Sequence, residues 1–266
     1  MTVDTHVHVG CTDADRYPRS PRGVGSDWWR TGDHGSGPLV ATLDAAGVER
    51  AVVVQAVGPY GYDCRCAVDA VGERPDRLRL VVAVDPTGAD PAAELRRLAR
   101  HAPVAGVRLF CVGGADEAWL ADGRAAAVWS LAGELGIVVV PTVFPARLPE
   151  VRRLAEAHPG VAVALDHAGF PELPLAVDAP VLGLADVPWV HLKVSSHVLG
   201  DAPDAVALVR TLAARFGADR LCWGSDYPQT STDYAALLAL GIAAAEGLAP
   251  GERDAFLSAT ATRLWA

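Results

Sequence analysis

The chain has 266 residues, of which 51% are hydrophobic and 21% charged, and its formal net charge is −9 at neutral pH. This composition predicts a globular protein with a sizeable core, and the length suits one α/β barrel of about 250 residues. The acidic balance excludes a general nucleic-acid binder, because nothing would offset repulsion by phosphates. No apolar run approaches the roughly twenty residues that cross a bilayer, so no membrane partner is expected.

The first predicted strand, residues 1–10, alternates between two kinds of side chain. One set is Val3, Thr5, Val7 and Val9. Asp4, His6 and His8 form the other, and a period of two sends each set to its own face. Two imidazoles above a carboxylate would make half of a metal site or a cluster that polarises a carbonyl. The alternative is a pair of histidines that satisfy each other's hydrogen bonds inside a barrel.

A long loop, about residues 11–38, follows this strand and is rich in Gly, Pro, Arg and Asp. Loops of this length in compact proteins are usually functional. Four arginines surround two tryptophans in it: Arg16, Arg19, Arg22 and Arg30 around Trp28 and Trp29. Two interpretations stay open, an anion-binding lid and a solvated loop whose tryptophans cover one end of the barrel. Exposed tryptophans here would also suit the interface of a homo-oligomer.

The rest of the chain alternates between predicted strands and helices. Strands are predicted at 52–54, 80–84, 104–110, 137–140, 161–166, 190–194 and 220–223. Helices are predicted at 39–46, 63–71, 92–101, 123–135, 149–158, 203–216, 233–246 and 250–265, with a short helical segment near 181–185. Eight strands alternating with helical segments indicate a single (β/α)8 TIM barrel that spans residues 1–266.

The five cysteines give no metal or redox motif. They are Cys11, Cys64, Cys66, Cys111 and Cys222. Cys64 and Cys66 are too close for a Cys-X-X-Cys pair, and no zinc-ribbon spacing is present. The amino terminus runs straight into the first strand and leaves no room for a signal peptide. The sequence therefore predicts reduced thiols in a cytoplasmic protein.

Polar residues gather at the predicted strand ends, where the chemistry of such barrels lies. They are His6, His8, Gln55, Arg108, Asp166, His167, Lys193, Ser195, Ser196 and Asp226. A carboxylate at the end of the last strand, facing neutral imidazoles, is placed to take a proton from water. The resulting hydroxide can attack a carbonyl held by histidine, arginine or a metal.

Each of these residues also has a structural explanation. Gln55 would form a hydrogen bond across the barrel mouth, and Asp226 would bind turn amides. Arg108 and Lys193 would each pair with a barrel carboxylate such as Asp4, and for Lys193 this structural role is favoured. No Gly-X-Ser-X-Gly elbow and no phosphate-binding loop supports a serine hydrolase or a kinase.

Five segments in order carry a family resemblance: Asp4-Thr5-His6-Val7-His8, Gly106-Val107-Arg108-Leu109, Asp166-His167-Ala168-Gly169, Lys193-Val194-Ser195 and Trp223-Gly224-Ser225-Asp226-Tyr227-Pro228. With this series the chain resembles the amidohydrolase superfamily. More narrowly, it resembles the amidohydrolase-related branch that contains sugar-acid lactonases and 2-pyrone-4,6-dicarboxylate lactonase.

The resemblance implies a (β/α)8 barrel that opens a small lactone or related cyclic ester. Asp226 would be the general base, and His6, His8 and His167 would polarise the carbonyl or help to bind a metal. Substrate binding would fall to Arg108, Gln55, Lys193 and Ser195, with Arg108 a candidate for holding a carboxylate. The expected substrate is small and anionic or polyhydroxylated.

The sequence also departs from the family pattern. Residues 138–144 of the fifth strand hold neither the histidine nor the modified lysine of metal-dependent members, so a binuclear centre is not expected. A single divalent ion, zinc before others, on His6, His8 and Asp226 is one alternative, and a metal-free site is the other. Gln229 stands where pyrone lactonases tend to have histidine, which argues against the same substrate. A metal-dependent non-oxidative decarboxylase and a non-catalytic barrel that binds a small acid remain the alternative functions.

Overall fold

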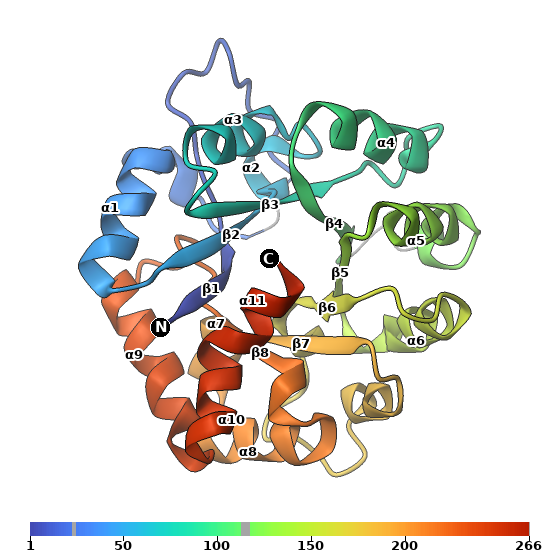
Figure 1. Cartoon of the computed structure of the whole chain (residues 1–266). Coiled ribbons are helices and arrows are strands. Elements are labelled where there is room, and N and C mark those ends of the chain that lie inside the picture. Colours follow the sequence, from blue (N-terminus) through green and yellow to red (C-terminus); the bar gives the residue numbers. More distant parts are fainter. Residues whose placement is uncertain (23–24, 113–117, 266) are drawn as a thin grey trace.

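The parallel sheet of this protein curls into a barrel with helices around it (Figure 1). The computed structural model describes residues 1–22, 25–112 and 118–265. Within these residues, eight strands follow one another in the sheet in chain order. They are β1 Val3–Val7, β2 Arg50–Val54, β3 Leu78–Ala83, β4 Val104–Cys111, β5 Val138–Val143, β6 Val163–Leu165, β7 Val190–Ser195 and β8 Leu221–Gly224. The predicted (β/α)8 barrel is confirmed.

The barrel closes where β1 meets the end of β8. A bridge pairs Val7 with Tyr227, and the amide of Asp226 donates to the His6 carbonyl at 2.8 Å. Gly224 makes this approach feasible, because a Cβ at that position would lie only 2.9 Å from the Cβ of His6. The closure brings the first histidines beside Asp226 from the other end of the chain.

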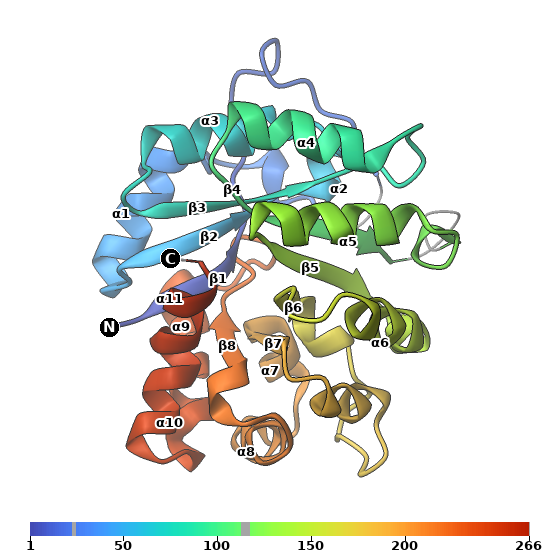
Figure 2. The ribbon, with the colours of Figure 1, turned by 45° about the vertical axis from the view of Figure 1, so that its right-hand side comes forward.

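Helices cover the outside of the sheet, as Figure 2 shows for α3, α4 and α5. Their bounds are α1 Ser36–Ala46, α2 Val57–Tyr60, α3 Arg65–Glu73, α4 Pro91–His101, α5 Arg124–Leu135, α6 Leu148–Ala157, α7 Ser196–Asp201, α8 Ala205–Phe216, α9 Tyr234–Ala244, α10 Pro250–Asp254 and α11 Thr260–Leu264. Helix α4 begins one residue before the predicted range, at Pro91, where Asp90 caps it by accepting from the Ala93 amide. The predicted last helix is divided, because a π-helical stretch, Ala255–Ala259, separates α10 from α11.

Two apolar layers hold the barrel together. Outward-facing strand residues such as Val53, Leu80 and Val107 pack in the large cluster that includes the helices. A smaller cluster inside includes Val54, Val138 and Trp265, and Figure 1 shows α11 and the carboxyl terminus over the barrel centre. Because apolar side chains fill that end, the polar interior residues lie toward the carboxyl ends of the strands.

An irregularity in β1 decides which of its side chains enter the barrel. The register against β2 shifts between Asp4 and Val7. Val3 belongs to the inner cluster and Val7 to the outer one, so the alternation changes phase between them. The expectation that Asp4 lies beneath the imidazoles is wrong. Its carboxylate instead accepts from the amides of His6 and Ser225 and from the hydroxyl of Tyr234 on α9.

The cysteines also differ from the expectation. Cys11 and Cys66 form a disulfide with Cα atoms 6.0 Å apart, although they are 55 positions apart in sequence. The prediction that all five thiols are reduced is therefore wrong, because packing of the first loop against α3 pairs two cysteines that spacing does not relate. Cys64, Cys111 and Cys222 are buried and form no disulfide within the described residues. No helix of the described residues is long and apolar enough to cross a membrane.

Candidate active site

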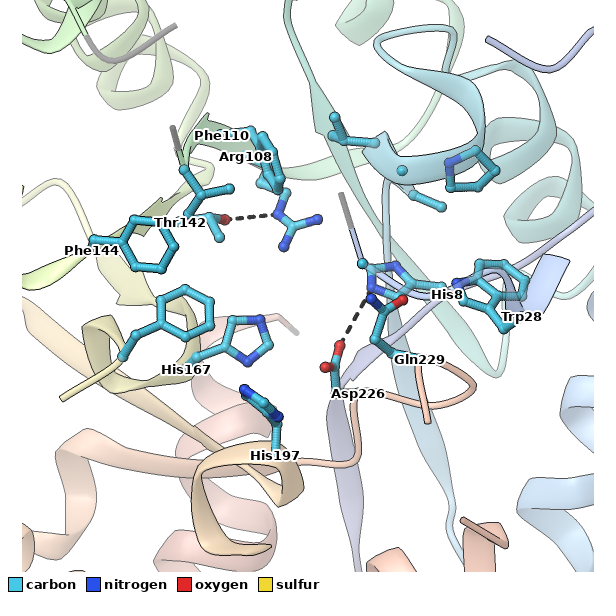
Figure 3. Close-up of a pocket in the computed structure, with 17 residues that line it drawn as sticks. His8, Trp28, Arg108, Phe110, Thr142, Phe144, His167, His197, Asp226 and Gln229 are labelled. Carbon is cyan, nitrogen blue, oxygen red and sulfur yellow. Dashed lines mark hydrogen bonds and ion pairs between the residues drawn. The ribbon is translucent and has the colours of Figure 1, made fainter. Parts of the chain in front are cut away.

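A cavity of about 360 Å³ opens at the carboxyl ends of the strands. Its polar lining consists of His8, Arg108, Thr142, His167, His197, Asp226 and Gln229. Its apolar lining includes Trp28, Val57, Phe110, Phe144 and Phe170. In Figure 3, His8, Arg108, His167 and Asp226 point toward one another across this space. Four of the predicted site residues thus meet in one pocket.

Asp226 lies between His6 of β1 and His8, which directly follows that strand. Its Oδ1 is 3.6 Å from Nε2 of His6 and 3.5 Å from Nε2 of His8. Nδ1 of His8 lies 2.8 Å from the carbonyl oxygen of Val54. Because a carbonyl oxygen only accepts, Nδ1 of His8 carries the hydrogen, and in the neutral ring Nε2 is bare. Two acceptors therefore face each other across 3.5 Å, a spacing suited to a cation between them or to a water that bridges them from the pocket side.

A buried ionic network lies under the pocket floor and centres on Asp166. Its Oδ1 is 2.7 Å from Nζ of Lys193, and its Oδ2 accepts from Nε of Arg108 at 3.1 Å and from Oγ1 of Thr142 at 2.7 Å. Nη1 of Arg108 also donates to the carbonyl of Gln55. The barrel carboxylate expected to pair with Arg108 and Lys193 is thus Asp166 and not Asp4.

His167 and Asp226 both have left-handed backbone conformations, which residues other than glycine rarely adopt. The φ angles are 53° at His167 and 60° at Asp226. Strain of this kind persists where the surrounding structure holds it, often at functional sites. Here, the hydrogen bond between Nδ1 of His167 and Oγ of Ser195, at 2.8 Å, fixes the imidazole against β7.

The ionisation of the site is set by burial and by the network. Burial lowers the pKa of His167 to about 4, against the pull of the Asp226 and Asp166 carboxylates. Burial and the Lys193 ammonium likewise hold the pKa of His6 well below its ordinary value. Both rings are therefore neutral near pH 7.

The pKa values of the two carboxylates are lowered as well, but here the shift runs against the effect of burial. Burial alone would raise the pKa of Asp226, but the imidazoles around it, His167 first, attract the carboxylate as they become charged in acid and hold its pKa below the usual range. For Asp166, burial is outweighed by Lys193, His6 and Arg108, which hold its pKa well below the ordinary value. Both carboxyl groups are therefore ionised at neutral pH.

The other predicted site residues do not line the cavity. Gln55 donates from Nε2 to the carbonyls of Gly61 and Asp63, which holds the loop after β2. Lys193 and His6 are fully buried beneath the pocket, and Ser195 supports His167 and caps α7. Their contact with the site is indirect, through the residues that they hold.

The first loop covers the pocket with a tryptophan and keeps its arginines away from it. Trp28 is 9% exposed, so the expectation of two exposed tryptophans is wrong for it. The arginines have partners elsewhere, such as Asp69 for Arg16 at 2.6 Å and Asp27 for Arg30 at 2.9 Å. Arg19 lies over the Trp29 ring, 4.8 Å from its centroid. None of the four loop arginines lines the cavity.

Several lining residues were not predicted from the sequence. Thr142 follows Pro141 in β5, in a strand set aside because it lacks a histidine or lysine. Thr142 is two positions after Val140, so both side chains lie on the same face of β5, inside the barrel. This alternation could have identified Thr142 as a lining residue. Phe110 is the second-last residue of β4, and Phe144 and Phe170 lie after β5 and β6, but an aromatic residue at such a place is also a common core residue.

The atoms around Asp226 also meet the positional needs of one metal ion. His6, His8 and Asp226 each offer a ligand atom within 4.8 Å of the others, and so do His6, Asp166 and His167. Nε2 of His6 is buried with no partner in the described part of the chain. Two imidazole nitrogens and a carboxylate oxygen form a donor set that zinc accepts. By the positions of its atoms, the first group therefore fits a single divalent ion, provided that Nε2 of His6 carries no hydrogen.

Comparison with known proteins agrees with this fold. A curated relative, the L-fucono-1,5-lactonase of Burkholderia ambifaria, is 32% identical over 223 residues, which are 78% of this chain and 76% of the relative. The structure of a candidate 2-pyrone-4,6-dicarboxylic acid hydrolase of Pseudomonas putida superposes with a TM-score of 0.81 at 26% identity, covering 99% of this chain and 97% of the other.

A Burkholderia multivorans amidohydrolase, solved with bound zinc, superposes with a TM-score of 0.78 at 23% identity, over 100% of this chain and 99% of the other. At that identity the likeness concerns the fold. The model of the amidohydrolase protein family matches residues 3–266 of this chain. The chain therefore belongs to the amidohydrolase family.

Proposed function

We propose that this protein hydrolyses a small lactone to the open hydroxy acid. The observation that carries the proposal is the Asp226 carboxylate, which faces the bare Nε2 of His8 at 3.5 Å in a pocket that also holds Arg108 and His167. The relative named as an L-fucono-1,5-lactonase supports the same reaction class.

In the proposed mechanism, one water lies in the pocket beside Asp226 and His8, bridges their two facing atoms and donates to both. Asp226 takes the proton as the water oxygen attacks the lactone carbonyl carbon. The ring C–O bond then breaks, and Asp226 returns the proton to the leaving alkoxide oxygen. Water and lactone together give the hydroxy acid, and Asp226 ends as a carboxylate.

The lowered pKa of Asp226 makes it a weak base, so the carbonyl needs strong polarisation. Arg108 and His167 lie across the pocket from Asp226 and are the proposed donors to the developing oxyanion. Donors that are already fixed in place stabilise such a charge without reorganisation. The bonds of Arg108 to Asp166, Thr142 and Gln55 fix its guanidinium in this way.

The pocket favours a neutral, polyhydroxylated lactone over an anionic one. Arg108 is the one lysine or arginine that lines the cavity in the described ranges, and its charge is already paired with Asp166 at 3.1 Å. A substrate carboxylate would also face Asp226. The aromatic rings of Phe110, Phe144 and Phe170 instead suit the apolar face of a sugar ring, with hydroxyls directed at the polar side.

The assay with a chelator and with added zinc tests whether hydrolysis needs a metal ion. If an ion is present, His6, His8 and Asp226 would hold it, and it would polarise the carbonyl or lower the pKa of a bound water.

The test is a substrate panel run on the purified protein after treatment with a chelator and after addition of zinc. We expect hydrolysis of neutral sugar lactones, followed by proton release, and much slower turnover of pyrone dicarboxylates. Release of carbon dioxide from aromatic acids would support the decarboxylase instead. Binding of lactones or acids without turnover in either metal condition would indicate the non-catalytic barrel and overturn the proposal.

A further inference from the structure

The histidine that does not reach the pocket, His6, is held from below by a lysine. Nδ1 of His6 lies 3.0 Å from Nζ of Lys193, which lies 2.7 Å from Oδ1 of Asp166. All three side chains have an exposed fraction of zero. Bulk water therefore does not compete for these contacts, and the donors and acceptors that meet here must be matched by the protein itself.

The chemistry of Lys193 fixes the hydrogen of His6. An ammonium paired with a carboxylate has three donors and no acceptor, so Nδ1 of His6 must offer its lone pair. Asp166 Oδ1 lies 3.2 Å from the same Nδ1 and would suit a hydrogen there. That hydrogen would, however, meet the closer ammonium. The neutral ring therefore carries its hydrogen on Nε2.

His8 has the opposite arrangement. Its Nδ1 faces the Val54 carbonyl at 2.8 Å and carries the hydrogen, which leaves Nε2 bare. The two imidazoles thus present different groups to Asp226: His6 presents an N–H donor, and His8 presents a bare nitrogen that accepts.

We propose that Lys193 is a positioning residue that fixes His6 as the Nε2–H tautomer, so that His6 acts as a hydrogen-bond donor toward Asp226 and not as a metal ligand. The buried Nε2 of His6 has no hydrogen bond in the described part of the chain, and it faces Oδ1 of Asp226 at 3.6 Å, so an N–H there is directed at the carboxylate. A donor from below orients the carboxylate and leaves its other lone pairs for the attacking water. It also leaves only His8 and Asp226 as bare ligand atoms, too few to hold zinc tightly.

Replacing Lys193 should raise the affinity of the site for zinc, whereas general damage to the site would lower it. Without the ammonium, a hydrogen on Nδ1 of His6 can donate to Asp166, and Nε2 becomes bare. Three ligand atoms then surround one point, so the Lys193→Met variant should bind zinc at least tenfold more tightly than the wild type. Lys193→Gln is the matched control, because its amide can still donate to Nδ1 and should keep both the tautomer and the weak zinc binding.

The test combines nitrogen-15 NMR of the histidine rings with calorimetric zinc titration. His6 is assigned by the signals that disappear in His6→Gln. We expect the Nε2–H tautomer in the wild type and in Lys193→Gln, and Nδ1–H in Lys193→Met. An Nδ1–H signal for His6 in the wild type overturns the proposal without any variant having to fold, and so does equal zinc affinity in folded Lys193→Met and Lys193→Gln.

Two additions keep the test decisive. If Lys193→Met leaves Asp166 unpaired and unstable, the double variant with Asp166→Asn removes that charge. The amide oxygen of the asparagine can still accept from Nδ1 of His6, so the same gain in zinc affinity is expected. The role in catalysis rests on the proposed function and is read from kcat, expected to fall tenfold or more in Lys193→Met with KM nearly unchanged. The tautomer and the zinc affinity do not depend on the substrate, so the failure of the lactonase proposal would be distinguishable from failure here.

Discussion

Trp28 of the first loop is stacked on His8 of the first strand, with ring centroids 6.3 Å apart and planes inclined by 10°. Trp28 also meets His34 edge-on, and Gly10 donates to the His34 carbonyl at 3.0 Å. The loop is thus folded back onto the strand that carries the site. Trp28 forms both the cover of His8 and a wall of the pocket, so it links the loop to substrate binding.

The first prediction concerns this wall. Trp28→Ala should lower kcat/KM for a neutral lactone by about 10- to 100-fold, mainly through KM, because a large apolar contact surface is lost. Trp29→Ala is the control, since Trp29 lies between Arg19 and Arg30 and does not line the cavity. Steady-state kinetics of both variants checks this. Equal losses would mean that the loop acts only as a structural cover.

The second prediction concerns Asp226. Asp226→Asn should reduce kcat by roughly two to four orders of magnitude, because the amide cannot take a proton from water. Asparagine tolerates the left-handed backbone at this position, where φ is 60°, so the fold should persist. The exposed Asp178, changed to asparagine, is the control. A variant that retains wild-type kcat with a native circular dichroism spectrum would rule out Asp226 as the base.

Alternation and strand order were enough to predict the barrel and the meeting of His6, His8, His167 and Asp226. The chain order of strands is also their order in the sheet, so residues at strand ends converge by topology. The position predicted for Asp4 was wrong because a register shift in β1 exchanges the inward-facing and outward-facing residues. No feature of the amino-acid sequence indicates that shift.

Contacts between distant segments were not predictable in the same way. Asp166 was a candidate, but its choice as the carboxylate for both Arg108 and Lys193 depends on which side chains reach the barrel axis at one height. The Cys11–Cys66 disulfide depends on how the first loop packs against α3. Sequence spacing carries no information on either.

The third prediction follows from that disulfide. It closes a loop with a sequence separation of 55, and a loop of this size restricts the unfolded chain enough to stabilise the fold by about 2–4 kcal/mol. Reduction with a mild thiol should therefore lower the free energy of unfolding by this amount. The double variant Cys11→Ser/Cys66→Ser should match the reduced protein and show no response to the thiol. Urea denaturation with and without reductant measures both, and identical curves for the wild type would show that the bond contributes nothing.

The fourth prediction is a loss of stability in mild acid through His167. Its pKa falls from 6.5 in the unfolded chain to about 4 in the folded one. As the pH drops below 6.5, the His167 ring is protonated in the unfolded chain but stays neutral in the folded protein. The free energy of unfolding therefore declines until the pH reaches about 4. The full difference amounts to roughly 3 kcal/mol, at about 1.4 kcal/mol for each pKa unit. Asp226, whose pKa is lowered from 3.8, loses its own contribution only at lower pH, outside this range.

His167→Asn isolates this effect, because asparagine accepts the left-handed backbone and has no titrating group. The variant should be less stable than the wild type at pH 7 through lost contacts, but its free energy of unfolding should fall less steeply between pH 6.5 and 4. His6 contributes to the slope in both proteins, so only the difference between them reports on His167. Urea denaturation at pH 7, 6, 5 and 4 gives that difference, and parallel pH profiles would show that His167 is not held neutral by burial.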